Sequence, residues 1–132
     1  MGVIEHIPHT PRPFLLALNE TVKRGGWLLL DTPNLAYLYT RLRLERGESI
    51  FCPLPAQWGT AIPFEGHHRE YTISEITWML EQLHHDPVEI ETFNYSYLAL
   101  SVLQGADLEN HRRMEADPTM REIIFSVSRR TQ

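Results

Sequence analysis

Polar side chains that could contact a substrate follow a short apolar run early in the chain. Residues 27–30 are four consecutive apolar residues, and the sequence Asp-Thr-Pro-Asn follows at 31–34. The apolar run predicts a strand that is buried on both faces, as in a parallel sheet. Ligands of open α/β sheets bind just beyond the carboxyl ends of the strands. We therefore expect Asn34 and Tyr37 to contact a substrate.

A second polar group stands at the end of residues 47–66, a long segment without regular periodicity. Long irregular segments in compact domains often cover a functional site, and we expect the aromatic residues Phe51, Trp58 and Phe64 to tie this one down. The polar residues that follow it are predicted to close over a substrate, with Arg69 meeting an anionic group. The predicted substrate contacts in this group are His67, Arg69 and Tyr71. The alternative is that Arg69 and Glu70 pair with neighbouring residues and fix the start of the next helix.

The third group, Glu5 and His6, lies at the start of the chain. Residues 2–4 (Gly-Val-Ile) look like the end of a buried strand, and these two side chains follow at once. Imidazole titrates near neutrality, which makes His6 the best candidate for a general base. The alternative is that Glu5 and His6 cap the following helix or bond local backbone.

Strands and helices that position these groups alternate along the chain. Apolar spacing predicts helices at residues 11–23, 35–46 and 72–83, the last opened by a capping box of Thr72 and Glu75. Strands are expected at 27–30, 88–94 and 122–129, with a charged surface excursion at 105–118. The segment 95–104 is apolar and its structure is left open. This order predicts one α/β domain over residues 1–132, with an early parallel βαβ unit and a final antiparallel pair at the sheet edge.

Composition excludes several classes of protein. The 132 residues carry a formal net charge of −5, which argues against a large nucleic-acid interface. The basic run 41–46 is interpreted as the solvated face of a helix, with contact to a phosphate or lipid headgroup as the alternative. Cys52 is the only cysteine, so no intramolecular disulfide can form. No signal peptide or membrane span is recognised, and a cytoplasmic location is expected.

Three separated motifs resemble one family, the class I S-adenosylmethionine-dependent methyltransferases. Residues 3–7 (Val-Ile-Glu-His-Ile) resemble the family's fourth strand, and residues 23–34 resemble its fifth strand with the turn that enters it. Residues 66–72 (Gly-His-His-Arg-Glu-Tyr-Thr) resemble a segment that precedes a helix in many methyltransferases of small molecules, glycans and lipids. The resemblance implies a partial Rossmann-like fold: strands 4 to 7 of the family in a mixed sheet, with flanking helices.

The resemblance also implies an activity and a set of site residues. The reaction is methyl transfer from S-adenosylmethionine to a small molecule, lipid or glycan, preferably on oxygen. Gly2, Val3 and Ile4 correspond to residues beside the methionine part of the cofactor, and Glu5 and His6 to catalytic residues in the reaction crevice. Some relatives hold a divalent metal with residues that correspond to Glu5, His6 and His67.

The family's glycine-rich cofactor turn has no counterpart in this sequence. We therefore expect a methyltransferase domain that lacks its N-terminal half and binds S-adenosylmethionine weakly or not at all on its own. A start codon set downstream of the true one would give the same picture. A different hypothesis is a non-catalytic remnant or assembly module, which pairs with a partner chain or a second copy through an exposed sheet edge.

Overall fold

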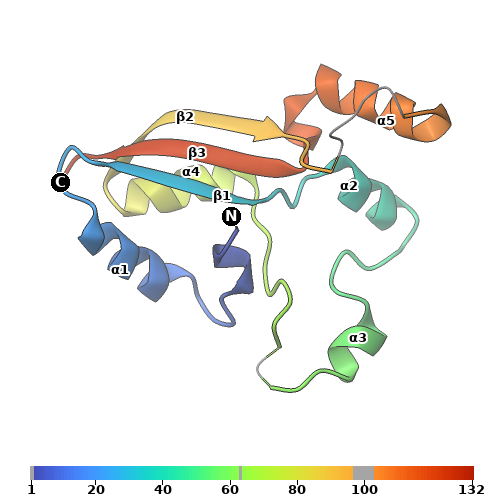
Figure 1. Cartoon of the computed structure of the whole chain (residues 1–132), viewed down its shortest axis with the longest axis horizontal. Helices are drawn as coiled ribbons and strands as arrows, with labels where there is room; N and C mark the ends of the chain where they lie inside the picture. Colours follow the sequence, from blue (N-terminus) through green and yellow to red (C-terminus); the bar gives the residue numbers. More distant parts are fainter. Residues whose placement is uncertain (1, 63, 97–102) are drawn as a thin grey trace.

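The computed structural model describes residues 2–62, 64–96 and 103–132, and its centre is a three-stranded sheet (Figure 1). The strands are β1 (Trp27–Pro33), β2 (His85–Phe93) and β3 (Ile123–Arg130). The last strand of the chain, β3, lies between the other two and runs antiparallel to both. The predicted antiparallel pairing of the last two strands is confirmed, and β2 forms one edge of the sheet.

The predicted parallel start of the sheet is wrong. Residues 2–4 form no strand; instead Ile4–His6 form a short 3₁₀ turn, η1, closed by a hydrogen bond from the His6 N–H to the Val3 carbonyl at 3.0 Å. A strand exists only where a second strand pairs with its backbone, and three residues cannot supply that partner from their own sequence. All strand pairs among the described residues are antiparallel, so the sheet is not the mixed sheet that we expected.

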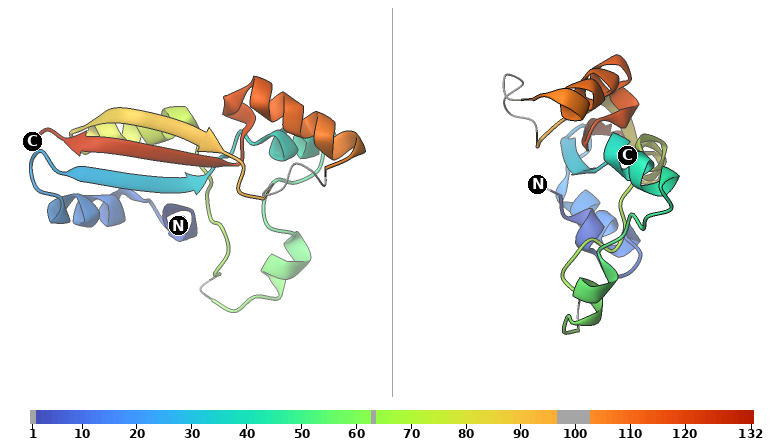
Figure 2. Two further views of the ribbon diagram at one scale, coloured as in Figure 1. Left: turned by 45° about the horizontal axis from the view of Figure 1, so that its top comes forward. Right: turned by 90° about the vertical axis from the view of Figure 1, so that its right-hand side faces the viewer.

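One face of the sheet carries the core. Helices α1 (Arg12–Thr21) and α4 (Ile73–Gln82) pack on this face; in the left view of Figure 2, α4 is partly hidden behind β2 and α1 lies below β1. Side chains alternate along a strand, so Leu28 and Leu30 point into the core while Trp27 and Leu29 are exposed. The prediction that residues 27–30 are buried on both faces is therefore wrong, because no helix of the described chain covers the second face.

The remaining helices lie beyond the end of the sheet where β1 stops (Figure 1). They are α2 (Leu38–Glu45), α3 (Leu54–Trp58), α5 (Gly105–Ala116) and the 3₁₀ turn η3 (Pro118–Met120). The three predicted helices are confirmed with shorter bounds. The expected surface excursion at 105–118 is largely the helix α5, which buries Met114. Residues 97–102, within the segment whose structure was left open, lie outside the described residues.

The start of α4 is fixed by the capping box that the sequence predicts. The Thr72 hydroxyl accepts a hydrogen bond from the Glu75 N–H, and the Glu75 carboxylate accepts one from the Thr72 N–H. Loss of such a cap typically costs about 1 kcal/mol. The box matters for the site because it fixes the end of the segment that carries His67.

Membrane-spanning helices are absent from the parts of the chain that the structure describes. No helix there combines the length and the apolar character needed to cross a bilayer.

A buried histidine connects the sheet to α1. His85 starts β2, and its Nε2 lies 2.9 Å from Asn19 Oδ1 while its Nδ1 lies 3.0 Å from the Ser128 hydroxyl. The Asn19 amide nitrogen donates to the Leu83 carbonyl, which fixes the orientation of the amide. Asn19 Oδ1 therefore accepts the hydrogen bond that His85 Nε2 donates. Burial, and then the positive charge of Arg130, lower the pKa of His85, so at neutral pH the ring is neutral in the folded protein.

This histidine makes the stability of the fold depend on pH. Below about pH 6.5, the ordinary pKa of imidazole, the unfolded chain takes up a proton that folded His85 does not. We expect His85→Gln to lower the free energy of unfolding by about 1–3 kcal/mol at neutral pH, because hydrogen bonds to Asn19 and Ser128 are lost. The difference from wild type should shrink as the pH falls through about 6. Urea unfolding at several pH values measures it.

The matched control for this prediction is His9→Gln, which removes an exposed histidine from the loop before α1. It should leave the free energy of unfolding close to that of wild type at every pH. If the difference in free energy of unfolding between wild type and His85→Gln stayed constant with pH, His85 would not be the neutral buried histidine described above.

Candidate functional site

Three segments that are far apart in the sequence meet at Glu5. The Glu5 carbonyl accepts hydrogen bonds from the His68 N–H at 2.6 Å and the Arg69 N–H at 3.3 Å. The Glu5 carboxylate accepts one from the Thr32 hydroxyl of β1 at 3.4 Å. The turn η1, the end of β1 and residues 67–69 are therefore held against one another.

A second connection lies just beyond β1. Asn34 and Tyr71 form an isolated parallel bridge, and the Leu35 N–H donates to the Tyr71 carbonyl at 2.9 Å. The segment after β1 and the segment before α4 thus run side by side. The three sequence motifs at residues 3–7, 23–34 and 66–72 converge in space.

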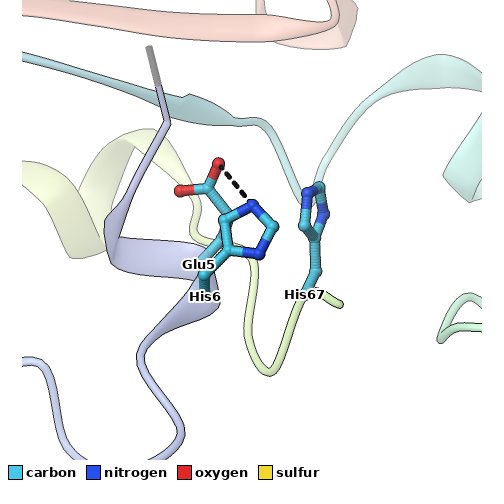
Figure 3. A group of neighbouring side chains, drawn as sticks. All are labelled: Glu5, His6 and His67. Atoms are coloured by element: carbon cyan, nitrogen blue, oxygen red, sulfur yellow. Dashed lines mark ion pairs between the residues drawn. The ribbon is translucent and has the colours of Figure 1, made fainter. Parts of the chain in front are cut away.

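The centre of this convergence is a cluster of Glu5, His6 and His67 (Figure 3). The two imidazole rings face each other edge to face, with centroids 4.7 Å apart and an interplanar angle of 82°. His6 Nε2 lies 4.0 Å from Glu5 Oε1, and one ligand atom from each of the three residues lies within 4.8 Å of the others. Only 3% of Glu5 is exposed, whereas both histidines are open to solvent.

Hydrogen bonds to residues outside the cluster determine which ring nitrogens carry a hydrogen. His6 Nδ1 lies 3.0 Å from the Glu65 carbonyl oxygen, and His67 Nδ1 lies 2.9 Å from Glu70 Oε1. A carbonyl and an ionised carboxylate can only accept, so both Nδ1 atoms carry the hydrogen and donate. In the neutral rings, each Nε2 then keeps its lone pair. Such outer hydrogen bonds are typical of histidines that ligate a metal or accept a proton.

The residues expected beside the cofactor have unequal exposure. Ile4 is fully buried in the core, so its side chain packs against protein. Val3 is about half exposed. Gly2 lies against the Glu5 carboxylate, and a Cβ built on it would approach Oε1 to 1.7 Å, so any larger residue requires Glu5 to move. Of these three residues only Val3 has an exposed side chain, and contact of residues 2–4 with a cofactor stays a prediction.

Of the two substrate contacts predicted after β1, Asn34 is almost fully buried. Its amide nitrogen donates to the Thr119 and Arg121 carbonyls at 2.9 and 2.7 Å, and its Oδ1 accepts from the Ala36 N–H at 3.0 Å. This geometry ties β1 to η3 and gives Asn34 a structural role. Tyr37 lies at the start of α2, with its ring 5.4 Å from that of Tyr39. Substrate contact by either residue stays a prediction.

Of the substrate contacts predicted before α4, two contact other residues of the protein and one lies in the cluster. Arg69 forms an ion pair with Glu75 and lies over the Tyr71 ring, 5.4 Å from its centroid. Glu70 bonds to His67. These are the pairings of the structural alternative, in which Arg69 and Glu70 fix the start of the helix. Tyr71 is buried in the core, and this burial raises the pKa of its hydroxyl against the opposing charge of Arg69. His67 is the one residue of this group that belongs to the cluster with Glu5 and His6.

Two hollows lie near these residues. One of about 260 Å³ opens beside His67 and includes three residues that sequence reasoning did not assign to a site: Arg43, Phe51 and Cys52. Arg43 lies in α2 and belongs to the basic run 41–46, whereas no local pattern marks Phe51 and Cys52, which reach the hollow through the irregular segment after α2. The other, of about 420 Å³, is a groove between α1 and α4 with Arg69 and Tyr71 at one end.

Comparisons with models of known protein families and with curated proteins find no match to this chain.

Proposed function

We propose that this chain is the substrate-side portion of an S-adenosylmethionine-dependent methyltransferase. The observation that carries the proposal is the convergence of residues 3–7, 23–34 and 66–72, the three segments that resemble the family, around Glu5. Separate chance resemblances would have no reason to meet at one place. The site they form lies at the carboxyl end of β1, where the Thr32 hydroxyl meets the Glu5 carboxylate.

His6 is the general base of this proposal. Its Nε2 has a lone pair and is open to solvent on the side of Glu5 and His67. A hydroxyl of the methyl acceptor placed there would donate to Nε2 and lose its proton as the new bond forms. The buried carboxylate of Glu5 then stabilises the imidazolium, 4.0 Å away.

S-adenosylmethionine, when bound, supplies an electrophilic methyl group. Within this chain its neighbours would be the backbone of Gly2 and the side chain of Val3, beside Glu5. The seven glycines of the sequence include no glycine-rich turn that follows a strand. The chain therefore offers one wall of a cofactor site, and we expect weak or absent binding by this chain alone.

The same cluster fits a divalent metal ion. Glu5, His6 and His67 offer one carboxylate oxygen and two imidazole nitrogens within 4.8 Å of one another, a donor set that suits zinc or manganese. Both histidines are oriented by outer hydrogen bonds to oxygen. A bound ion would lower the pKa of an acceptor hydroxyl and would replace His6 as the base, because the one free lone pair of His6 Nε2 would then be held by the ion.

A second candidate function is assembly through the edge of the sheet. Within the described residues, β1 has no strand on its outer side, and Asp31 is its only charged residue. The opposite edge strand, β2, is interrupted by Pro87 with a register shift and carries Glu89 and Glu91. Proline, bulges and charges discourage further pairing, so β1 is the edge that would accept a strand of a second copy.

The methyltransferase proposal predicts that turnover depends on His6. With labelled S-adenosylmethionine at about 1 mM and pooled lipids and glycans as acceptors, we expect His6→Asn to lower the rate of methyl transfer by about 10²–10⁴-fold, because the base is lost. His9→Asn, on the neighbouring loop, is the matched control and should keep the rate. Calorimetry with S-adenosylhomocysteine should give a Kd of about 1 mM or weaker.

Two results would count against this proposal or part of it. Equal measurable rates of methyl transfer for wild type and His6→Asn would refute the catalytic role. A Kd below about 10 μM would show that this chain holds a complete cofactor site, contrary to the single wall described above.

The assembly proposal predicts a dimer that forms through β1. Leu29 and Val88 are exposed to a similar extent, 60% and 59%, on the two opposite edge strands. We expect Leu29→Lys to convert the dimer to a monomer at about 100 μM chain, while Val88→Lys leaves it intact. Size-exclusion chromatography with light scattering measures this. A monodisperse wild-type monomer at that concentration would exclude pairing with a second copy through β1.

A further inference from the structure

The segment between α2 and His67 exposes large apolar side chains. We call residues 50–62, which contain α3, the α3 arm. Trp58 and Ile62 on this arm are 86% and 99% exposed, the two highest values among large hydrophobic residues of the described chain. Phe51 and Leu54 are also mostly exposed. The expectation that Phe51 and Trp58 tie the segment down is therefore wrong, although Phe64 packs against the His68 ring.

The arm projects from the body of the molecule. In Figures 1 and 2, α3 lies well away from the sheet and from the helices that cover it. Leu54 and Trp58 are four residues apart in α3 and so lie on the same side of this helix. Residues 49–64 contain no charged residue and no histidine. The arm is a convex, uncharged, apolar surface.

A cluster of exposed large apolar side chains marks a candidate interaction surface. A protein partner would need a hollow shaped to receive the arm, whereas the interfacial region of a bilayer accepts convex apolar side chains of many shapes. Tryptophan is the side chain best suited to that region, because its ring is apolar and its N–H remains hydrated. The arm carries its tryptophan at the C-terminal end of α3, among its most exposed residues.

Charges at the base of the arm define how it would bind. The flanking residues 41–48 and 65–70 contain four arginines (41, 43, 46 and 69) and four glutamates (45, 48, 65 and 70), so their charges cancel. Arg46 and Glu48 pair with each other, and Arg69 pairs with Glu75. With a neutral base and a net charge of −5 on the whole chain, attraction to anionic lipid has little to contribute. Binding would depend on the apolar side chains alone.

We propose that the α3 arm inserts into the interfacial region of a lipid bilayer and holds this face of the protein at the membrane surface. The hollow beside His67 is lined in part by Phe51, Cys52 and Pro53, at the base of the same arm. The membrane surface would thus lie next to the Glu5–His6–His67 cluster. This proposal goes beyond methyl transfer, since binding of vesicles requires neither S-adenosylmethionine nor an acceptor.

Flotation with phosphatidylcholine vesicles tests the proposal. We expect the full chain to float with vesicles of phosphatidylcholine alone, with little change on adding phosphatidylglycerol or raising the salt concentration. The double variant Leu54→Ser with Trp58→Ser should lower the partition coefficient by about tenfold or more, because the apolar contacts are lost. Both positions are exposed, so the fold should persist, and far-UV circular dichroism checks this.

The matched control removes two exposed tryptophans elsewhere, Trp27→Ser with Trp78→Ser. It should bind vesicles like wild type, and it leaves Trp58 as the only tryptophan. The emission of that tryptophan should then shift to shorter wavelength on addition of vesicles.

Three results would overturn the proposal. The first is no flotation of the wild type with phosphatidylcholine vesicles. The second is equal flotation of wild type and the arm variant. The third is a dimer in the absence of lipid that the arm variant converts to a monomer, which would make a second copy the occupant.

Discussion

The buried position of Glu5 is the constraint on which the rest of the site depends. A buried carboxylate and a buried carbonyl both need hydrogen-bond donors, and this chain supplies them from β1 and from residues 68–69. Satisfying Glu5 therefore fixes the turn η1 against the end of the sheet. His6 follows Glu5 directly and His67 precedes His68, so the same bonds bring the two imidazole rings together.

The one-sided packing of the sheet determines which surfaces remain available. Helices α1 and α4 both pack on the face that carries Leu28, Leu30 and Ile124, and the other face keeps Trp27 and Leu29 exposed. The open edge of β1, the uncovered face and the α3 arm are separate consequences of where this chain places its helices. If both proposals hold, methyl transfer beside His67 and insertion of the arm point to an acceptor carried by lipid.

Local sequence patterns predicted the parts of the fold that depend on neighbouring residues. Examples are the capping box of Thr72 and Glu75 and the strands β2 and β3. A cap and an alternating strand each depend on residues only a few positions apart in the sequence. The strand expected at residues 2–4 failed, because strand formation depends on a partner elsewhere. Burial of residues 27–30 on both faces failed for a similar reason: an apolar run does not reveal whether a second layer exists.

The candidate site was predictable in its residue types and less so in their partners. Glu5, His6 and His67 were expected together, and the structure brings them together. Asn34 was expected to face a substrate, yet its amide bonds to Thr119 and Arg121, more than 80 positions later. The exposure of Trp58 also depends on the path of the whole arm, which no short pattern encodes.

The direct test of the Glu5–His6–His67 site is the protonation of its two imidazole rings. A long-range ¹H–¹⁵N NMR spectrum of the protein at about pH 7.5, above the ordinary pKa of histidine, distinguishes the two nitrogens of each ring. The site described here predicts that His6 and His67 are protonated at Nδ1, and that both Nε2 signals move together when Zn²⁺ is added, while those of His9 do not. Protonation of either ring at Nε2, or Nε2 signals that do not move when Zn²⁺ is added, would contradict this account of the site.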